Sequence, residues 1–122
     1  MNIKILPIIT VRKGSSLKDK NIRPYKGKPL LANAIDKLKS TVGYALVISD
    51  NECYGELAME WGADVFYDET VKNLDDVTLR FRNYCQKTSY EGWIILLQCT
   101  SPNIKEETII RFYEEVKNLR KD

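Results

Sequence analysis

A chain of 122 residues, 43% of them hydrophobic and 30% charged, has the composition of a single globular domain, which excludes a low-complexity or disordered protein. Its net charge of +2 is too small to indicate binding to nucleic acid or a membrane, because such binding needs many cationic contacts on one face. The N-terminal apolar run, residues 3–11, is interrupted by Lys4 and Pro7 and has no cleavage site after it, so we expect no signal peptide. No apolar run approaches the roughly 20 residues of a membrane span.

Three cysteines, Cys53, Cys85 and Cys99, are odd in number and lie far apart, with no pair at metal-ligand spacing. The chain contains no histidine that could activate a thiol. We therefore expect reduced core thiols rather than disulfides or a catalytic cysteine, and a cytoplasmic location.

Residues 2–10 predict a first strand, because they are rich in isoleucine and too apolar for simple alternation, as is typical of a central parallel strand. The loop 11–27 follows, with Gly14, two serines, Arg12 and the lysines at 13, 18 and 20 near its start, and Asp19 beside them. Backbone N–H groups of a Gly/Ser turn, a guanidinium and ammonium groups together suit a polyphosphate. The alternative is an ordinary turn with solvated lysines.

Pro29 stands where a helix favours its first residue, and apolar residues at helical spacing extend this first helix to about residue 40. Residues 44–49 predict a second strand. Asp50 or Asn51 predicts the N-cap of a second helix, which Gly62 ends.

A third strand is predicted at residues 64–67, a third helix at about 71–87 and a fourth strand at 93–98. Asn103, with Glu106 three residues later, predicts a capping box at the start of the last helix. The apolar stripe of that helix consists of Ile109, Phe112, Val116 and Leu119.

Strands that alternate with helices predict βαβ units, hence a three-layer αβα sandwich around a mostly parallel, Rossmann-like sheet of about four strands. We expect the first strand in the centre, the second and third on one side, and the fourth on the other. Between the first and fourth strands lies the switch point of such a sheet, where a crevice opens beyond the carboxyl ends of the strands. Loops 11–22 and 98–103 would face each other there, which brings the cationic loop against Gln98, Thr100 and Ser101.

Several short motifs follow one another in a familiar order. They are Val11-Arg12-Lys13-Gly14-Ser15, Lys20-Asn21-Ile22, Gly27-Lys28-Pro29-Leu30, Ile48-Ser49-Asp50, Trp61-Gly62-Ala63 and Leu96-Leu97-Gln98-Cys99-Thr100-Ser101-Pro102. In these motifs the chain resembles the sugar-acid cytidylyltransferases, the family typified by acylneuraminate cytidylyltransferase (CMP-sialic acid synthetase). The resemblance spans essentially the whole chain and implies the nucleotide-diphospho-sugar transferase type of fold.

The resemblance also implies a reaction of carbohydrate biosynthesis, in which CTP and a sugar acid, with Mg²⁺, give a CMP-sugar and pyrophosphate. The anomeric hydroxyl of the sugar would attack the α-phosphorus directly, so that no nucleophilic side chain is required. CMP-sialic acid synthesis is the typical case.

By position in these motifs, the resemblance implies roles for individual residues. Arg12 and Lys20 would be catalytic, because they hold the phosphates and offset charge on the departing pyrophosphate. Gly14 and Ser15 would line the triphosphate, and Lys18 would substitute for a lysine of the family pattern. The nucleoside would be read by Asn21, Gln98 and Ser101.

The chain also departs from the family pattern. Lys13 replaces a glycine, Ser16 replaces a lysine, and Asp68-Glu69 stands where the family has Arg-Pro. The family continues into a segment that supplies the magnesium carboxylates, contacts to the sugar acid and a dimerisation arm. We expect this segment to be absent, which leaves residues 1–122 as one nucleotide-binding domain with metal ligands that the sequence does not identify.

Whether the chain is an active enzyme therefore stays open at this point. The alternatives are a degenerate non-catalytic nucleotide-binding or interaction module and an inactive fragment of a longer enzyme. The first loop argues against a dinucleotide-binding dehydrogenase, because it has a single glycine where close approach to a pyrophosphate needs several. Exposed apolar surface where the missing segment would pack predicts self-association, for example as a homodimer.

Overall fold

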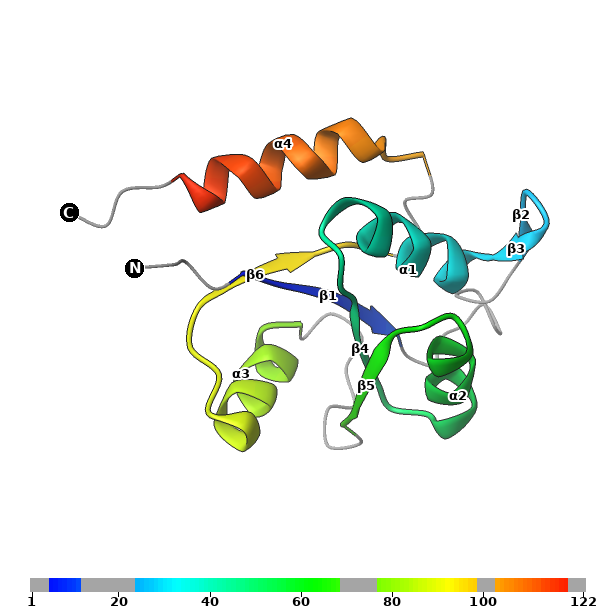
Figure 1. Cartoon of the computed structure of the whole chain (residues 1–122). Coiled ribbons are helices and arrows are strands. Elements are labelled where there is room, and N and C mark those ends of the chain that lie inside the picture. The colour runs from blue at the N-terminus through cyan, green and yellow to red at the C-terminus, as the bar shows by residue number, and fades with distance from the viewer. Residues whose placement is uncertain (1–4, 12–23, 69–76, 99–102, 119–122) are drawn as a thin grey trace.

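The computed structural model describes residues 5–11, 24–68, 77–98 and 103–118, and it is built on a four-stranded parallel sheet with helices on both faces (Figure 1). In chain order the elements are β1 (Ile5–Val11), β2 (Pro24–Tyr25), β3 (Lys28–Pro29), α1 (Leu30–Thr41), β4 (Leu46–Ser49), α2 (Glu52–Glu60), β5 (Asp64–Tyr67), α3 (Val77–Thr88), β6 (Trp93–Leu96) and α4 (Glu106–Lys117). The main sheet has the order β5-β4-β1-β6, so β1 is central and β6 returns on its other flank. The predicted fold class and strand order are confirmed.

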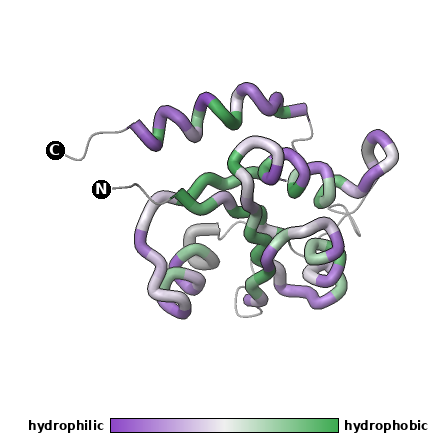
Figure 2. Tube along the Cα trace, viewed as in Figure 1, coloured by the Kyte–Doolittle hydropathy of each residue, from purple (hydrophilic) through white to green (hydrophobic). Residues whose placement is uncertain are grey.

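The two faces of the sheet bury different side chains, because successive residues of a strand point to opposite sides. Ile9 and Val11 of β1 join the larger core cluster, which α1, α2 and α4 cover. Leu6 and Ile8 point the other way and join a smaller cluster with Phe81 and other residues near α3. Figure 2 shows the hydrophobic residues concentrated along these central strands.

β1 is buried along nearly its whole length, with Ile8 and Ile9 fully inaccessible. This burial on both faces explains why its sequence is continuously apolar rather than alternating. β1 extends to Val11, one residue past the predicted end at residue 10, while the predicted residues 2–4 lie outside the described part of the chain. The predicted second and fourth strands are shorter in the structure, at Leu46–Ser49 and Trp93–Leu96.

A small hairpin, β2–β3, lies in what the sequence predicts as loop. Pro24 pairs with Pro29 and Tyr25 with Lys28, so Lys26 and Gly27 form a two-residue turn. Both turn residues have positive φ, at 52° and 83°, as a type I′ turn requires. Two-residue strands carry no periodicity, which is why the sequence pattern does not reveal them.

The predicted capping box of the last helix is wrong. The N-cap of α4 is Lys105, with no side-chain cap, and Glu106 is the first helical residue. The Glu106 carboxylate instead accepts a hydrogen bond from Ser40 Oγ on α1, at 2.7 Å. Glu106 therefore makes a tertiary contact with α1 instead of the local capping contact that the sequence predicts.

The prediction of core thiols also needs correction. Cys53 and Cys85 are free, but Cys53 is exposed and Cys85 is only half-buried. The buried face of α2 consists of Tyr54, Gly55 and Ala58, so Cys53 turns outward. Cys99 lies outside the described residues. None of the described helices has the length and apolar character needed to cross a membrane.

Candidate functional site

The carboxyl ends of β1, β4 and β6 lie together at one edge of the sheet. β1 pairs in parallel with β6 up to Ile8↔Leu96 and with β4 up to Val11↔Ser49. The two loops predicted to face each other, which follow β1 and β6, therefore both start at this edge and from adjacent strands. From β1 the chain adds β4 and β5 on one side of the sheet and then returns to add β6 on the other side of β1. The position between β1 and β6 is therefore the switch point, where open α/β sheets bind ligands.

Of the predicted nucleotide-binding residues, the structure describes Gln98. The backbone N–H of Leu97 donates to the carbonyl of Ile8 at 3.0 Å, and the Leu97 side chain is buried in the core. This contact carries the chain past the end of β6, so Gln98 emerges exposed at the predicted edge. The other candidates lie outside the described residues: Arg12, Gly14, Ser15, Lys18, Lys20, Asn21 and Ser101.

Side-chain hydrogen bonds hold the chain at the end of β4. Ser49 is completely buried, and its hydroxyl donates to the carbonyl of Asn51 at 2.9 Å and accepts from the N–H of the same residue at 3.0 Å. Asn51 in turn caps α2 by accepting from the N–H of Tyr54 at 3.1 Å, as the sequence predicts for one of its two cap candidates. The turn after β4 is therefore fixed by its own side chains.

The β2–β3 hairpin ends the cationic segment and is attached to α1. Lys28 Nζ forms an ion pair with Asp36 Oδ2 and lies 5.5 Å from the ring centroid of Trp61. Asn33 Nδ2 donates to the carbonyl of Pro29 at 3.1 Å and, more weakly, to that of Lys28 at 3.4 Å. The Lys28 and Asp36 side chains are about 40% exposed, so such a pair contributes little to stability. Its main effect is to fix where the chain returns from the loop.

The segment that leads into α4 is attached to the same helix. Lys37 Nζ donates to the carbonyl of Ile104 at 2.7 Å, and Ser40 binds Glu106 as described above. Burial lowers the pKa of Lys37 below its ordinary value, the nearby Glu106 carboxylate opposes this effect, and the positive charge of Lys26 adds to it. Sequence reasoning missed these contacts, because residues 33, 36, 37 and 40 look like any solvated face of a helix.

The described carboxylates do not form a metal site. Asp68 is 5% exposed, its carboxylate accepts from Asn83 Nδ2 at 3.0 Å, and its N–H donates to the carbonyl of Ser49 at 2.9 Å. These contacts make Asp68 part of the packing between β5 and α3. Within residues 5–11, 24–68, 77–98 and 103–118, no three His, Cys, Asp or Glu side chains lie close enough to hold a metal ion together.

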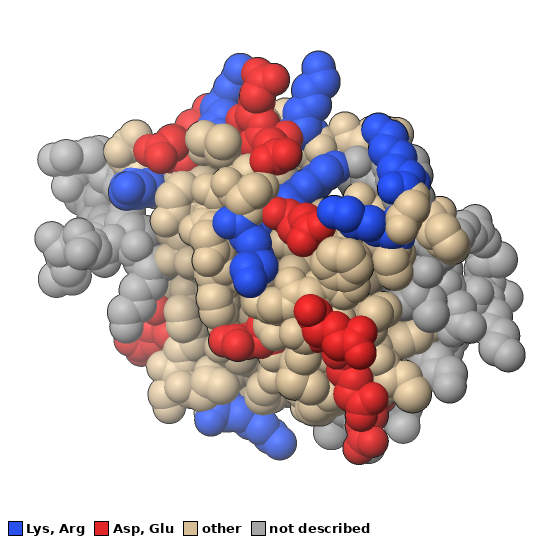
Figure 3. Space-filling model, turned by 45° about the vertical axis from the view of Figure 1, so that its right-hand side comes forward, with Lys and Arg blue, Asp and Glu red and all other residues tan. Residues whose placement is uncertain are grey.

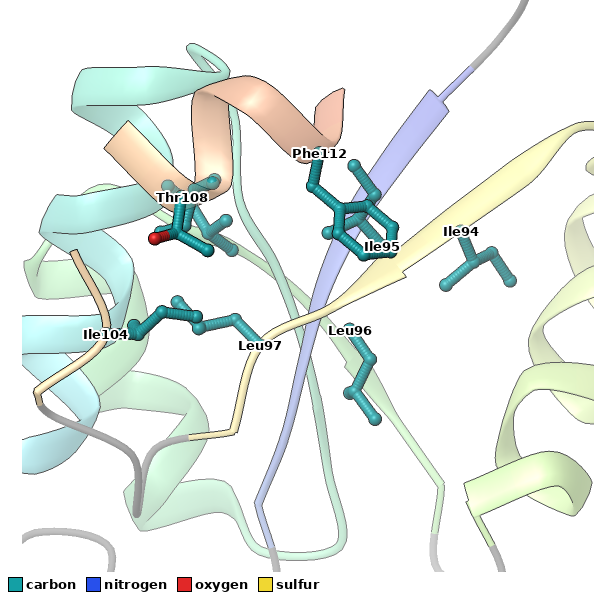
Figure 4. Close-up of a pocket in the computed structure, with 9 residues that line it drawn as sticks. Ile94, Ile95, Leu96, Leu97, Ile104, Thr108 and Phe112 are labelled. Atoms are coloured by element: carbon teal, nitrogen blue, oxygen red, sulfur yellow. The ribbon is translucent and has the colours of Figure 1, made fainter. Parts of the chain in front are cut away.

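An apolar groove of about 280 Å³ lies between β6 and α4 (Figure 4). Phe112 points over Ile95, Thr108 supplies a hydroxyl, and Ile104 and Leu97 line the end nearest the predicted site. A pocket with so few polar groups does not suit a triphosphate. In the view of Figure 3, basic and acidic side chains are interspersed over the described surface, which gives that face no field of a single sign.

Comparison with known proteins shows which family this chain resembles. The family model described as cytidylyltransferase matches residues 6–122, which is nearly the whole chain. The chain belongs to the cytidylyltransferase family. It is 33% identical, over 127 aligned positions, to the N-acylneuraminate cytidylyltransferase of Escherichia coli O18:K1:H7 (strain RS218 / NMEC). The resemblance seen in the short motifs is thereby confirmed.

Solved structures share the fold of this cytidylyltransferase-family chain. A CMP:2-keto-3-deoxy-manno-octonic acid synthetase complexed with CTP superposes with a TM-score of 0.76 at 22% identity, over 92% of this chain and 46% of its own. A cytidylyltransferase from Leptospira borgpetersenii serovar Hardjo-bovis (strain JB197) gives 0.74 at 19% identity, over 93% and 48%. The chain thus spans about half the length of these structures, and 30% of the length of the curated E. coli relative.

Proposed function

We propose that this chain is the nucleotide-binding part of a cytidylyltransferase that transfers CMP from CTP to a sugar acid, such as an acylneuraminate, and releases pyrophosphate. The observation that carries the proposal is the strand order. In a chain matched to the cytidylyltransferases from residue 6 to 122, the cationic loop after β1 and the Gln98 loop after β6 start from adjacent strands at the switch point.

The chemistry assigned to this site needs no protein nucleophile. The anomeric hydroxyl oxygen bonds to the α-phosphorus as the bond from that phosphorus to the oxygen shared with the β-phosphorus breaks. Pyrophosphate leaves with the negative charge, and the hydroxyl proton passes to solvent. Arg12 and Lys20 would hold the phosphates and offset the growing charge, while Gly14, Ser15 and Lys18 line the triphosphate. Asn21, Gln98 and Ser101 would contact the nucleoside.

Magnesium would accompany CTP as the counter-ion of its phosphates, in line with the family's common use of a metal. The described residues offer no cluster that could hold the ion, so no catalytic step is assigned to it through this chain. The identity of the sugar acid and the arrangement of subunits are likewise proposals, because this chain spans only about half the length of the matched structures and 30% of the length of the curated relative.

The test combines binding and turnover. Titration calorimetry with CTP and Mg²⁺ should show saturable binding, and a panel of sugar acids should reveal one that supports pyrophosphate release. Substituting Arg12→Met should lower turnover about a hundredfold to a thousandfold, the usual cost of one preorganised charge contact at a reaction centre. Lys117→Met, on the exposed end of α4, is the matched control and should leave turnover unchanged.

The second candidate is a non-catalytic nucleotide-binding module, which the departures at Lys13, Ser16 and Asp68 favour. CTP binding without pyrophosphate release at high protein concentration would select it over the enzyme. Absence of CTP binding would reject both nucleotide functions and leave an interaction module.

A further inference from the structure

A small polar pocket lies between the carboxyl end of β5 and α3. Its volume is about 140 Å³, and the described residues that line it are Phe66, Tyr67, Asp68, Asn83, Gln86 and Lys87. β5 is an edge strand of the described sheet, two strands and therefore roughly 10 Å away from β1. The pocket is thus distinct from the switch point between β1 and β6 and from the groove beside β6.

Alternation along β5 decides which side chains face α3. The ring of Phe66 meets the ring of Tyr84 on α3 edge-on, with the two centroids 5.0 Å apart. Asp68 is two positions further along the chain, so it lies on the same face of the sheet. The ring of Tyr67 lies on the other face, against Gly55 of α2. Phe66 and Asp68 therefore supply the β5 side of the pocket with an aromatic ring and a carboxylate.

Asp68 gives the pocket a charged acceptor that is held in place. The residue is 5% exposed, and its N–H donates to the carbonyl of Ser49 at 2.9 Å, which continues the pairing of β4 and β5 by one residue. Its carboxylate accepts from Asn83 Nδ2 at 3.0 Å. A carboxylate has two oxygens with about four lone-pair sites, so it can accept from a ligand as well. A group that is already fixed loses little conformational freedom on binding.

The α3 side of the pocket is a polar stripe. Asn83, Gln86 and Lys87 are spaced by three and four residues, so they share a side of the helix. Lys87 lies in the last turn of α3, where a cation is favourable without any ligand. The groups that point to a ligand are therefore the Asp68 carboxylate, which Asn83 holds, and the Gln86 amide. With one carboxylate and one ammonium, the described lining has no net charge.

Size and charge together select a class of ligand. Drug-sized ligands occupy pockets of roughly 300 Å³ or more, so a volume of about 140 Å³ does not suit a nucleotide. A lining without net charge, with a buried carboxylate in it, also disfavours a phosphate or another polyanion. Hydroxyl groups match this lining, because a carboxylate accepts from O–H and a primary amide both donates and accepts.

We propose that the pocket between β5 and α3 binds a small, neutral, polyhydroxylated ligand of about the size of one monosaccharide. Asp68 accepts hydrogen bonds from its hydroxyl groups, Gln86 binds a neighbouring hydroxyl, and the ring of Phe66 contacts its apolar C–H face. Asn83 is a positioning residue, which holds the carboxylate of Asp68. The site is independent of the proposed function, so its test requires neither CTP nor turnover.

NMR titration with D-glucose, D-mannose and D-ribose tests the proposal. The side-chain NH₂ signals of Asn83 and Gln86 report directly from the pocket. At least one of the three sugars should shift both signals saturably, with a dissociation constant on the order of millimolar, as expected for a ligand of about a dozen non-hydrogen atoms. Tetrahydropyran keeps the ring but lacks the hydroxyls, so it is the matched control ligand and should cause no saturable shift.

Three variants locate the binding site. Asp68→Asn keeps the shape of the side chain without its charge and should weaken sugar binding about tenfold or more, because hydrogen bonds to charged groups are the stronger ones. Gln86→Ala should weaken it about threefold to tenfold. Gln86 is exposed, so this variant keeps the proposal testable if Asp68→Asn fails to fold. Arg82→Ala is the control, since Arg82 is exposed on α3 outside the described lining, and it should change the affinity less than twofold.

Several outcomes would overturn the proposal. One is the absence of a saturable shift with all three sugars, and another is an equal shift with tetrahydropyran, since the hydroxyls would then not be recognised. If inorganic phosphate shifted the same signals at lower concentration than the sugars, the pocket would be an anion site instead. Equal losses of affinity in Gln86→Ala and Arg82→Ala would place the bound sugar elsewhere on the protein.

Discussion

At the scale of single residues, Gly55 shows how closely α2 approaches the end of β5. A Cβ at this position would lie 2.6 Å from two ring carbons of Tyr67 and closer still to its hydroxyl oxygen. Real Cβ atoms do not approach that closely, so the ring would have to move. Tyr67 is 42% exposed and can swing outward, which limits the cost but separates its ring from the helix.

We predict that Gly55→Ala has opposite effects in two backgrounds. With Tyr67 present, displacement of the ring should cancel or exceed the gain of about 1 kcal/mol that alanine offers over glycine inside a helix. In a Tyr67→Ala background, Gly55→Ala should raise the free energy of unfolding by up to that amount. Urea denaturation of the four proteins in this cycle measures the coupling, and additive effects would show that the ring does not rest on Gly55.

At the scale of elements, Tyr44 links the entries of two neighbouring strands. It precedes β4, and its hydroxyl donates at 2.6 Å to Oδ2 of Asp64, the first residue of β5. Burial, together with the hydrogen bond to Asp64, raises the pKa of Tyr44 above its ordinary value of 10.0. Since Tyr44 is 38% exposed, solvent screening keeps the effect on stability modest.

This contact predicts a pH dependence at the alkaline end. A tyrosine with a raised pKa in the folded state ionises first in the unfolded state, so its stabilising contribution is complete below pH 10 and falls as the pH rises further. The difference in unfolding free energy between the original chain and Tyr44→Phe should therefore be constant from pH 7 to about 9 and shrink above about 10. A difference that stays constant to pH 11 would contradict the assignment.

At the scale of the whole molecule, apolar surface gathers beside one edge of the sheet. β6 is an edge strand of the described sheet, and Trp93, Ile110 and Phe112 are 48%, 44% and 59% exposed. Phe112 lines the groove of Figure 4, and Trp93 and Ile110 are the sequence neighbours of two other lining residues, Ile94 and Ile109. Clustered apolar side chains beside an unpaired strand edge favour association.

We predict concentration-dependent self-association that involves this surface. Sedimentation velocity should show larger species as the protein concentration rises, and Phe112→Lys should reduce them. Met59→Lys is the control, because Met59 is 51% exposed on α2, where it has no part in the groove. A pure monomer at high concentration would reject the prediction, and equal effects of the two substitutions would reject the assignment to this edge.

The fold could be read from the sequence because its signals are local. Continuous apolar runs marked β1 and β6 as strands, and the 3.6-residue period marked the helices between them. The stripe of α4 was only partly a core signal: Ile109 and Val116 are buried, whereas Phe112 is exposed over the groove. A period shows which residues share a face, but it does not show how much of that face a neighbour covers.

By itself, the sequence determined the parallel α/β fold, the central place of β1 and the edge from which the candidate loops leave, because right-handed crossovers leave few ways to arrange four such strands. The short motifs determined the family. Tertiary structure decided that Glu106 binds Ser40 rather than capping its helix, and that Lys37 reaches Ile104. Such contacts join residues more than 60 positions apart, and their partners are chosen by the packing of α1 against the chain before α4, which no local pattern records.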